Sequence, residues 1–303
     1  MLWAMLVGGA QAADGLVWHW EEPRRYALHA QIDLPEGLRI LAVRNLEAQV
    51  LRVDVDLYTT CGVAQALGAS AWELSCAIDE ISLGALPARD GVDVVGAILG
   101  EMDERLSSAS VIMELTADGR LRSLDLRDLS KDDDREKQIY ETSRELLLRT
   151  FAAFDLQLPK KGDDHGKGSW KQARVRGLEP ISWNGVQGSA KATHTLTGVD
   201  GSVATITTHA SGAVGNNDQV QVGDTSRPAN LFDSELEGTA SFDLKSGTLL
   251  ERSYATVGKP TPSSLLAATS SGVIYAQAVT LHLASADEQL EPLRPSHVLL
   301  PER

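Results

Sequence analysis

The amino-acid sequence predicts a mainly β protein: a strongly curved antiparallel sheet, forming a half-barrel or incomplete barrel, with two amphipathic helices on one face. Three observations lead to this fold class. Apolar and polar residues alternate through much of the chain, as in half-buried strands. Only two segments have helical periodicity, and nearly all connections are short, which requires antiparallel neighbours. The pattern predicts about eleven strands and two helices.

Residues 1–12 have the layout of a secretory signal peptide. Leu2–Val7 is a short apolar run, Ala10 and Ala12 are small residues at a cleavage site, and charged sequence begins at Asp14. The run is too short to span a bilayer. No Lys or Arg precedes it, which a start codon assigned too late would explain. We therefore expect an exported protein, located in the bacterial periplasm or outside the cell.

The first predicted strands contain the only two cysteines. Residues 51–58 and 72–79 alternate between apolar and polar side chains, and continuing each pattern places Cys61 and Cys76 on buried faces. An even number of cysteines in an exported protein favours a disulfide over free thiols. The sequence therefore predicts a cross-strand disulfide, and two buried reduced thiols are the alternative.

The first predicted helix is followed by a hairpin. Residues 95–106 place apolar side chains on one helical stripe: Val95, Ile98, Leu99, Met102 and Leu106. The pair Asp118–Gly119 is typical of a type I′ turn between two alternating runs. This register gives the hairpin one apolar face, formed by Val111, Met113, Leu115, Leu124 and Leu126.

The second predicted helix is the longest element. Ser130 is the expected N-cap, and Asp132–Asp134 lie at the positive end of the helix dipole. Helical spacing then relates Ile139, Leu146, Leu147, Phe151 and Phe154, and Pro159 ends the helix. A calcium loop is the alternative for the three aspartates, but adjacent carboxylates point in different directions and the alternate-residue spacing is absent.

The second half reads as strands and turns. Asp200–Gly201 is a predicted hairpin turn, Gly247 is expected to be left-handed, and 214–236 has loop composition. The strands are expected at 169–176, 188–197, 202–213, 238–244, 248–257 and 273–283. We expect one β-rich domain over 13–287, with 159–168 as the place for an internal junction, and a polar tail at 288–303.

Composition limits the partners. The formal charge of -14 opposes binding to phosphate backbones and anionic lipid surfaces, so no nucleic-acid partner is expected. The longest stretch without Asp, Glu, Lys or Arg, 260–286, is diluted by Ser and Thr, so no integral membrane segment is expected. No cysteine follows the leader directly, so the protein is predicted to be soluble and not lipid-anchored.

No catalytic constellation emerges, and we expect no enzyme, no cofactor and no metal. Ser211 lacks the glycines of a nucleophile elbow, and the loop 162–168 lacks the spacing and the Ser or Thr of a phosphate loop. His194 and His209 are predicted on one face of a hairpin, with His194 opposite Thr207. That face has no carboxylate, so two ordinary strand histidines are favoured over a metal site.

Several short motifs occur in a familiar order: Ala117–Arg120 at a turn, Leu156–Pro159, Gly168–Trp170 and Phe242–Leu249. In these the chain resembles uncharacterised exported bacterial β-rich proteins with a leucine-proline … glycine-x-tryptophan junction and an F-D-x-x-x-G-x-L hairpin. The resemblance covers residues 40–285, and Lys160–Lys167 is an insertion relative to it. That family has no established activity, so it implies no catalytic residues. The element order is also similar to half-barrel lipoprotein carriers of the bacterial envelope.

These features predict a non-enzymatic exported envelope protein that binds an apolar ligand, such as a lipid, or a lipidated partner between sheet and helices. A sheet of about eleven strands around only two helices would leave a ligand-sized cavity. Its predicted lining is Val95, Leu99, Met102, Met113, Leu115, Leu147, Phe151 and Phe154. The alternative is a protein-interaction or structural module of the envelope, with an envelope protein as partner and no ligand cavity. The sequence does not define the oligomeric state.

Overall fold

The computed structural model describes residues 16–33, 50–68, 70–87, 93–159, 168–173, 175–176, 187–188, 190–215, 219–222, 224–228, 231–263 and 275–290. The predicted signal peptide, residues 162–167 of the loop that was compared with a phosphate loop, and most of the predicted tail lie outside these residues. The signal peptide, the tail and the division into domains therefore stay predictions.

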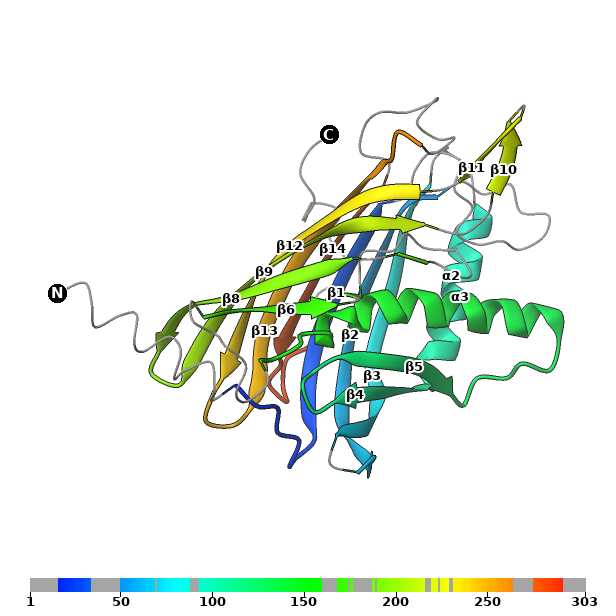
Figure 1. The fold of residues 1–303 in the computed structure, drawn as a ribbon. Coiled ribbons are helices and arrows are strands. Elements are labelled where there is room, and N and C mark those ends of the chain that lie inside the picture. The colour runs from blue at the N-terminus through cyan, green and yellow to red at the C-terminus, as the bar shows by residue number, and fades with distance from the viewer. Residues whose placement is uncertain are drawn as a thin grey trace.

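Twelve of the described strands form one antiparallel sheet, in the order β5-β4-β3-β2-β1-β14-β13-β12-β9-β8-β6, with β7 also pairing with β9 (Figure 1). Their bounds are β1 Arg24–Asp33, β2 Val50–Ala66, β3 Ala71–Pro87, β4 Ser110–Thr116, β5 Leu121–Arg127, β6 Ser169–Ala173, β7 Gln187–Gly188, β8 Lys191–Asp200, β9 Val203–Gly215, β12 Leu231–Asp243, β13 Thr248–Pro260 and β14 Tyr275–Leu283. Two further strands, β10 Gln219–Val222 and β11 Thr225–Pro228, form a separate ribbon.

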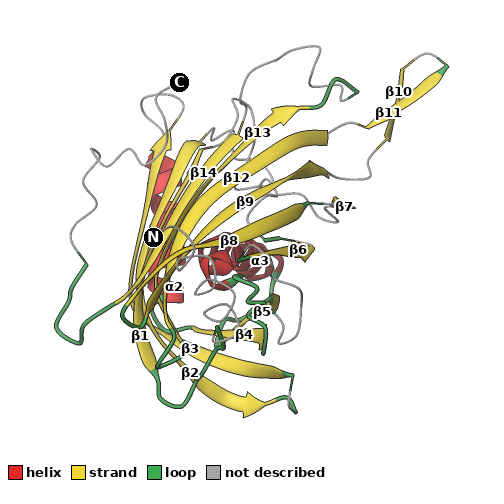
Figure 2. Cartoon of the chain, turned by 60° about the vertical axis from the view of Figure 1, so that its left-hand side comes forward, coloured by secondary structure: helices red, strands yellow, loops and turns green. Residues whose placement is uncertain are grey.

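The large sheet curves strongly and stays open. Figure 2 shows the strands wrapping around a helix that lies inside the curve. Within the described residues, the edge strands β5 and β6 do not pair with each other, so the sheet is not closed into a barrel. The predicted mainly β fold with a curved antiparallel half-barrel is confirmed.

Two α-helices are described, α2 Asp93–Leu106 and α3 Asp134–Phe151, and a 3₁₀ turn, η1 Ala152–Phe154, continues α3. The prediction that Ser130 caps α3 is wrong. The N-cap is Asp133, whose side chain accepts a hydrogen bond of 2.8 Å from the backbone N–H of Glu136. Ser130 donates to the side chain of Glu136 instead, because it lies one turn too early to reach the free backbone N–H groups.

Both helices bury side chains in the same core as the inner face of the sheet. A cluster of aromatic side chains covers one end of this core. Tyr26 on β1 and Phe154 on η1 pack edge to face at 5.0 Å between ring centroids. Trp18 and Trp20, which precede β1, stack on each other at 5.9 Å, and Trp18 also contacts Phe242 of β12 at 5.3 Å. The N-terminal segment therefore covers the end of the core at which the hairpin turns lie.

The prediction of loops throughout 214–236 is wrong in part. β12 already begins at Leu231 and pairs with β9 on one side and β13 on the other. Its first residues alternate, with Phe232, Ser234 and Leu236 buried and Asp233 and Glu235 exposed. Two flanking partners stabilise this polar-rich stretch as a strand, which local composition does not reveal.

Candidate ligand-binding site

Side chains from the sheet fix the C-terminal end of α3 on the concave face. The hydroxyl of Tyr254 donates to the carbonyl of Arg149 at 3.3 Å, and the Nη1 of Arg252 donates to the carbonyl of Ala153 at 3.0 Å. The last carbonyls of a helix lack partners within the helix and carry partial negative charge. The buried guanidinium and the phenol on β13 supply the missing hydrogen bonds, and the guanidinium also supplies a positive charge. The strand therefore fixes the position of the helix end.

Arg252 is 2% exposed, and burial lowers its pKa, which the nearby Tyr254 and Asp155 oppose. Burial also shifts the pKa of Tyr254, but upward, because the charged form of a phenol is the deprotonated one. A charged group with so little solvent contact is stable only when hydrogen bonds and opposite charge compensate. The carbonyl of Ala153 and the charge of Asp155 are the compensating groups described here.

The carboxylate of Asp155 connects the two edges of the open sheet. Its Oδ1 accepts from the backbone N–H of Leu121 at the start of β5, at 2.9 Å. Its Oδ2 accepts from Nε2 of Gln172 in β6 at 3.0 Å and from the backbone N–H of Arg176 at 2.8 Å. Burial raises the pKa of Asp155, while the donors from Arg176 and Leu121 and the charge of Arg252 act in the opposite direction.

Three of the four motifs of the sequence resemblance, Ala117–Arg120, Leu156–Pro159 and Gly168–Trp170, meet beside this carboxylate. Trp170 Nε1 donates to the carbonyl of Gln157 at 2.6 Å, the backbone N–H of Leu158 donates to Asp118 at 2.6 Å, and Trp18 Nε1 donates to Leu156 at 3.4 Å. Each of these three motifs supplies one side of a junction that holds the hairpin turn, the end of α3 and β6 together. Their position gives them a structural role.

Histidine geometry differs from the sequence expectation. His194 pairs across the strands with Thr208, and a bulge between Leu196 and Gly198 shifts the hairpin by one residue. His194 and His209 therefore lie on opposite faces, and the prediction that they share a face is wrong. His194 is fully buried, and hydrogen bonds of 2.9 Å join its Nδ1 to Thr208 and its Nε2 to Gln172.

Desolvation by burial, helped by the charge of Arg252, lowers the pKa of His194 to about 3. The ring is therefore neutral and acts as a hydrogen-bonded core residue. Among the described residues, no group of three or more His, Cys, Asp or Glu side chains is placed to hold a metal ion.

Two buried hydroxyls on the concave face lack partners. Ser234 on β12 is 1% exposed and Thr256 on β13 is fully buried, and among the described residues neither side-chain oxygen has a hydrogen-bond partner. Thr256 pairs directly with Gln277 of β14 on one side and with Leu236 of β12 on the other. Ser234 of β12 is a diagonal neighbour of Thr256. Nearly all buried polar atoms in proteins are hydrogen-bonded, so two orphans in one place need an explanation.

A positive charge reaches the same place from the helix. Arg149 is 7% exposed, and its Nη1 donates to Oε1 of Gln277 at 3.3 Å. Gln277 also donates through Nε2 to the hydroxyl of Tyr254 at 3.3 Å. The guanidinium of Arg149 is therefore directed to the row that contains Thr256. Sequence reasoning missed this site, because nothing in the local pattern separates a concave-face Ser or Thr from a surface one.

The predicted cavity lining lies elsewhere on the concave face. Leu99 and Met102 belong to α2, Met113 and Leu115 to β4, and Leu147, Phe151 and Phe154 to α3 and η1. All seven are buried in the common core, with Phe151 and Phe154 stacked at 5.9 Å. Val95 lies in α2, but its side chain is outside the described part. Contact of these residues with a ligand stays a prediction.

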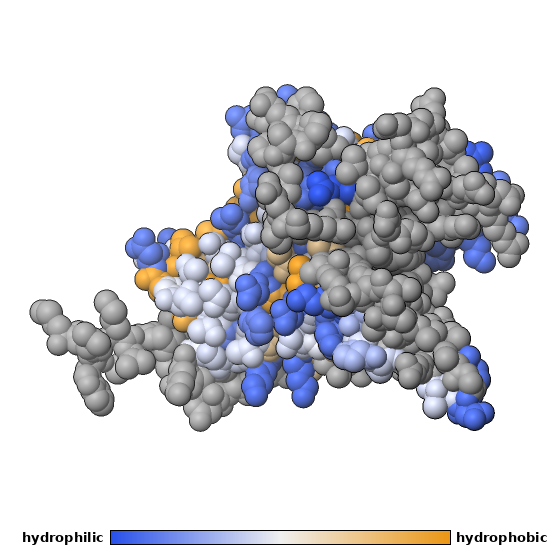
Figure 3. Space-filling model, turned by 90° about the horizontal axis from the view of Figure 1, so that it is seen from above, coloured by the Kyte–Doolittle hydropathy of each residue, from blue (hydrophilic) through white to orange (hydrophobic). Residues whose placement is uncertain are grey.

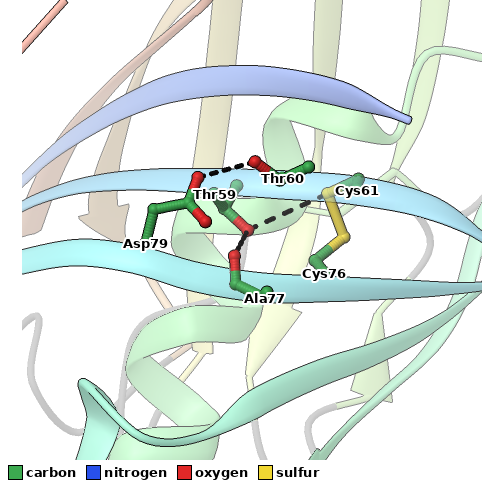
Figure 4. Close-up of a disulfide and its surroundings, with 6 residues drawn as sticks. All are labelled: Thr59, Thr60, Cys61, Cys76, Ala77 and Asp79. Carbon is green, nitrogen blue, oxygen red and sulfur yellow. Dashed lines mark hydrogen bonds between the residues drawn. A yellow bond between two sulfur atoms is a disulfide. The ribbon is translucent and has the colours of Figure 1, made fainter. Parts of the chain in front are cut away.

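The predicted disulfide is confirmed. Cys61 and Cys76 are directly opposed on β2 and β3, both are fully buried, and their sulfurs are bonded (Figure 4). The hydroxyl of Thr59 donates to the carbonyl of Ala77 at 2.7 Å beside the bond. The disulfide thus joins the two longest strands on their core face.

The outer face of the sheet carries an open groove of about 800 Å³. Hydroxyls from five adjacent strands cross it in one row: Thr195, Thr207, Thr239, Ser253 and Thr280. Figure 3 shows pale, intermediate hydropathy prevailing left of centre, on the side where Figure 1 places β8 and β9. None of the predicted lining residues contributes to this groove.

The hydroxyl row continues into an ionisable pair. Thr280 pairs with His29 on β1, and His29 Nδ1 is hydrogen-bonded to Asp56 of β2. Burial lowers the pKa of His29, but the hydrogen bond and charge of Asp56 and the charge of Asp54 outweigh it, so the net pKa is raised. This pair lies on the face opposite the buried hydroxyls Ser234 and Thr256.

Fold and site together define an open antiparallel half-barrel with a helix docked inside it and a polar spot on its concave face. No protein-family model matches the chain, and no curated protein matches it. The resemblance to exported β-rich proteins therefore stays a prediction. In the part of the chain that the structure describes, no helix is both long enough and apolar enough to cross a membrane.

Several solved structures are similar to this chain, lipovitellin and Rv2717c from M. tuberculosis among them. Lipovitellin, from a structure concerned with lipid–protein interactions, matches at 12% identity and a TM-score of 0.49, over 91% of this chain and 27% of that chain. The chain thus spans about a quarter of the length of lipovitellin. Rv2717c from M. tuberculosis matches at 10% identity and a TM-score of 0.25, over 91% of this chain and 98% of that chain. The architectural similarity is weak.

Proposed function

We propose that this is a non-enzymatic exported envelope protein that binds an apolar ligand, or the lipid of a lipidated partner, on its concave face between sheet and helices. The observation that carries the proposal is the pair of unpartnered buried hydroxyls, Ser234 and Thr256, beside an apolar concave surface. A ligand group that reaches both hydroxyls and accepts hydrogen bonds would satisfy them.

We infer that such a ligand would lie on the concave face of β8, β9 and β12. Helical contacts concentrate elsewhere: α2 packs on β3, α3 on β1 and β5, and η1 on β13 and β14. Small side chains line the inner face of the remaining strands, including Ala192 on β8 and Ala210 on β9, which are cross-strand partners. Small residues on a concave face let a ligand approach the backbone closely.

A structural or protein-interaction module is the second candidate. It is favoured by the tight aromatic packing of Phe151, Phe154 and Tyr26, which fills the core at the end that the N-terminal segment covers. In that case the hydroxyls would be satisfied by water, and no apolar ligand would bind.

Native mass spectrometry of the full chain, purified without detergent, tests the proposal. We expect a co-purified apolar ligand, and delipidated protein should bind a fluorescent polyene fatty acid. Ala210→Leu should reduce binding at least about tenfold, which corresponds to about 1.4 kcal/mol, because the larger side chain would occupy the place of the ligand. Ala213→Leu on the outer face of β9 is the matched control and should leave binding unchanged.

Thermal unfolding of both variants separates lost binding from lost folding. Ligand-free protein that also binds no probe after delipidation would overturn the proposal and favour the structural module. Export is tested separately by N-terminal sequencing of the protein from the producing cell, which should begin close to residue 13.

A further inference from the structure

The exposed apolar side chains of this protein gather at one end of the sheet. Within the described residues, five large apolar side chains are more than a third exposed: Val17, Val63, Leu67, Val199 and Leu283. Single exposed apolar residues are ordinary when they are scattered over a protein surface. Here all five lie at the end of the half-barrel where the hairpin turns are. We call this group the apolar rim.

The strand register places three members of the rim at this end. Cys61 of β2 pairs with Arg24, the first residue of β1. Val63 and Leu67 therefore lie beyond the point where β1 begins, at the β2–β3 turn. β14 runs antiparallel to β1, and Leu283 is its last residue, so it also lies beside the start of β1.

The other two members extend the rim toward β8. Val199 is the second-last residue of β8, next to the β8–β9 turn. Val17 lies beside the β12–β13 turn, because the backbone N–H of His19 donates to the carbonyl of Gly247 at 3.0 Å. Both sequence neighbours of Val17 are buried, so its own side chain points away from the core. Figure 3 shows apolar, orange residues at the surface on the left, where Figure 1 places the β8–β9 turn.

The rim continues the apolar concave face to the outside of the molecule. Val63, Val199 and Leu283 each pair across the strands with a residue of the common core. Those three partners are all buried: Leu74, Ala204 and Tyr26. Directly paired residues share one face of a sheet, so the three rim residues occupy concave-face positions that the core does not cover.

The rim is too small for a stable protein partner. Its five partly exposed side chains present a few hundred Å² of apolar surface, whereas a stable protein–protein interface buries about 800 Å² on each partner. A lipid surface requires no matched, contiguous patch. Hydrophobic burial is non-directional, so separate side chains can each enter the boundary between lipid head groups and acyl chains.

Charge selects the kind of lipid surface. Exposed charges of both signs lie among the rim residues, including Glu21, Asp200 and Lys245. The formal charge of the whole chain is -14, which repels an anionic membrane. A zwitterionic surface, with both charges in each head group and no net charge, is the one that this end of the molecule matches.

We propose that the apolar rim docks the protein reversibly on a zwitterionic lipid surface, with the turn end of the half-barrel facing the bilayer. This inference goes beyond the proposed function, because docking on a lipid surface requires no ligand inside the half-barrel.

Flotation of the full chain with phosphatidylcholine vesicles tests the docking. We expect the protein to float with these vesicles, and addition of phosphatidylglycerol to them should weaken binding, most strongly at low salt. Protein that does not float with phosphatidylcholine vesicles would overturn the proposal, whether or not the chain binds an apolar ligand. Tighter binding to the anionic vesicles would overturn the choice of surface. A dimer in sedimentation velocity that Val199→Asp dissociates, with no flotation, would assign the rim to a second copy of the chain instead.

Two rim variants and one control test the residues. Val199→Asp and Leu67→Asp should each weaken vesicle binding at least about tenfold, because a charge replaces an apolar side chain at the lipid boundary. Both positions are exposed, so the melting temperature should not change. Thr193→Asp is the matched control: it adds the same charge to an exposed position of β8 further from the turn and should leave binding unchanged. Wild-type binding in both rim variants, or an equal loss in Thr193→Asp, would contradict the assignment.

Discussion

The Oδ1 of Asp155 lies 2.9 Å from the backbone nitrogen of Leu121, the first residue of edge strand β5. Its other oxygen accepts from Gln172 in the opposite edge strand, β6. One carboxylate therefore spans the gap that keeps the half-barrel from closing. The end of α3 and η1 lies in that gap, and Arg252 donates to the carbonyl of Ala153 just before Asp155. The curvature of the sheet and the position of the helix are fixed by the same few contacts.

Replacing Asp155 by Asn should destabilise the protein by about 2–4 kcal/mol, since a buried charged network loses an acceptor and gains a misplaced donor. Three N–H donors converge on the carboxylate, and an amide has only one oxygen to receive them. Urea denaturation measures the change in the free energy of unfolding. Asp233→Asn on the exposed outer face is the control, and a similar loss in both variants would argue against the bridging role.

Gly119→Ala should destabilise the protein by at least about 2 kcal/mol, because a left-handed backbone is strained by a Cβ and the space is occupied. Gly119 has a φ of 85°, and a Cβ there would collide with the Trp18 indole and the carbonyl of Leu156. Gly201→Ala is the matched control: its φ is 60°, but nothing lies within 4 Å of the added atom. Its expected cost is the backbone strain alone, about 1 kcal/mol. Equal melting temperatures for the two variants would refute the steric argument.

Removal of the disulfide in Cys61→Ala/Cys76→Ala should lower the free energy of unfolding by about 3 kcal/mol in the chain-entropy account. The two residues are 15 apart in sequence, so the closed loop is short and the predicted effect moderate. Chemical denaturation with and without reductant measures it. Intact-mass analysis of the purified wild-type chain is the accompanying check, and two alkylatable thiols under non-reducing conditions would show that no disulfide forms.

His194 should make the protein sensitive to acid. Its folded pKa of about 3 lies below the ordinary histidine pKa of 6.5, so between these values the unfolded chain binds a proton that the folded chain excludes. Stability from this group is fully present above pH 6.5 and declines as pH falls, by about 2 kcal/mol between pH 7 and pH 5 from one such proton.

Denaturation at pH 7 and pH 5 measures this effect. His194→Gln should lose less stability than the wild type on going from pH 7 to pH 5. Thr208→Val keeps the histidine and should retain the wild-type pH dependence. A pH dependence that is the same in His194→Gln and the wild type would contradict a buried neutral ring.

Local patterns in the sequence were sufficient for most elements of the fold. Alternation predicted the strands that carry Cys61 and Cys76 and, with them, the disulfide. The apolar stripes predicted α2 and α3, and Gly247 has the left-handed backbone expected of its turn, with a φ of 62°. These features depend on residues close in sequence, or on a period that strand and helix geometry impose directly.

Other features were decided by contacts between residues far apart in sequence. The bulge near Leu196 changed the register by one residue and moved His194 to the opposite face from His209, which no local pattern encodes. β12 forms over a segment of loop composition because partners are available on both sides.

The sequence by itself determined the fold class, the two helices and the disulfide, because each follows from periodicity or from a count of residue types. Only the tertiary structure decided that Asp155 joins β5 to β6, and that Ser234 and Thr256 are buried without partners while Thr208 is satisfied. The physical reason is that a hydroxyl or carboxylate has the same local sequence signature whether water, backbone or nothing surrounds it. Its environment depends on which distant strands the curved sheet brings together.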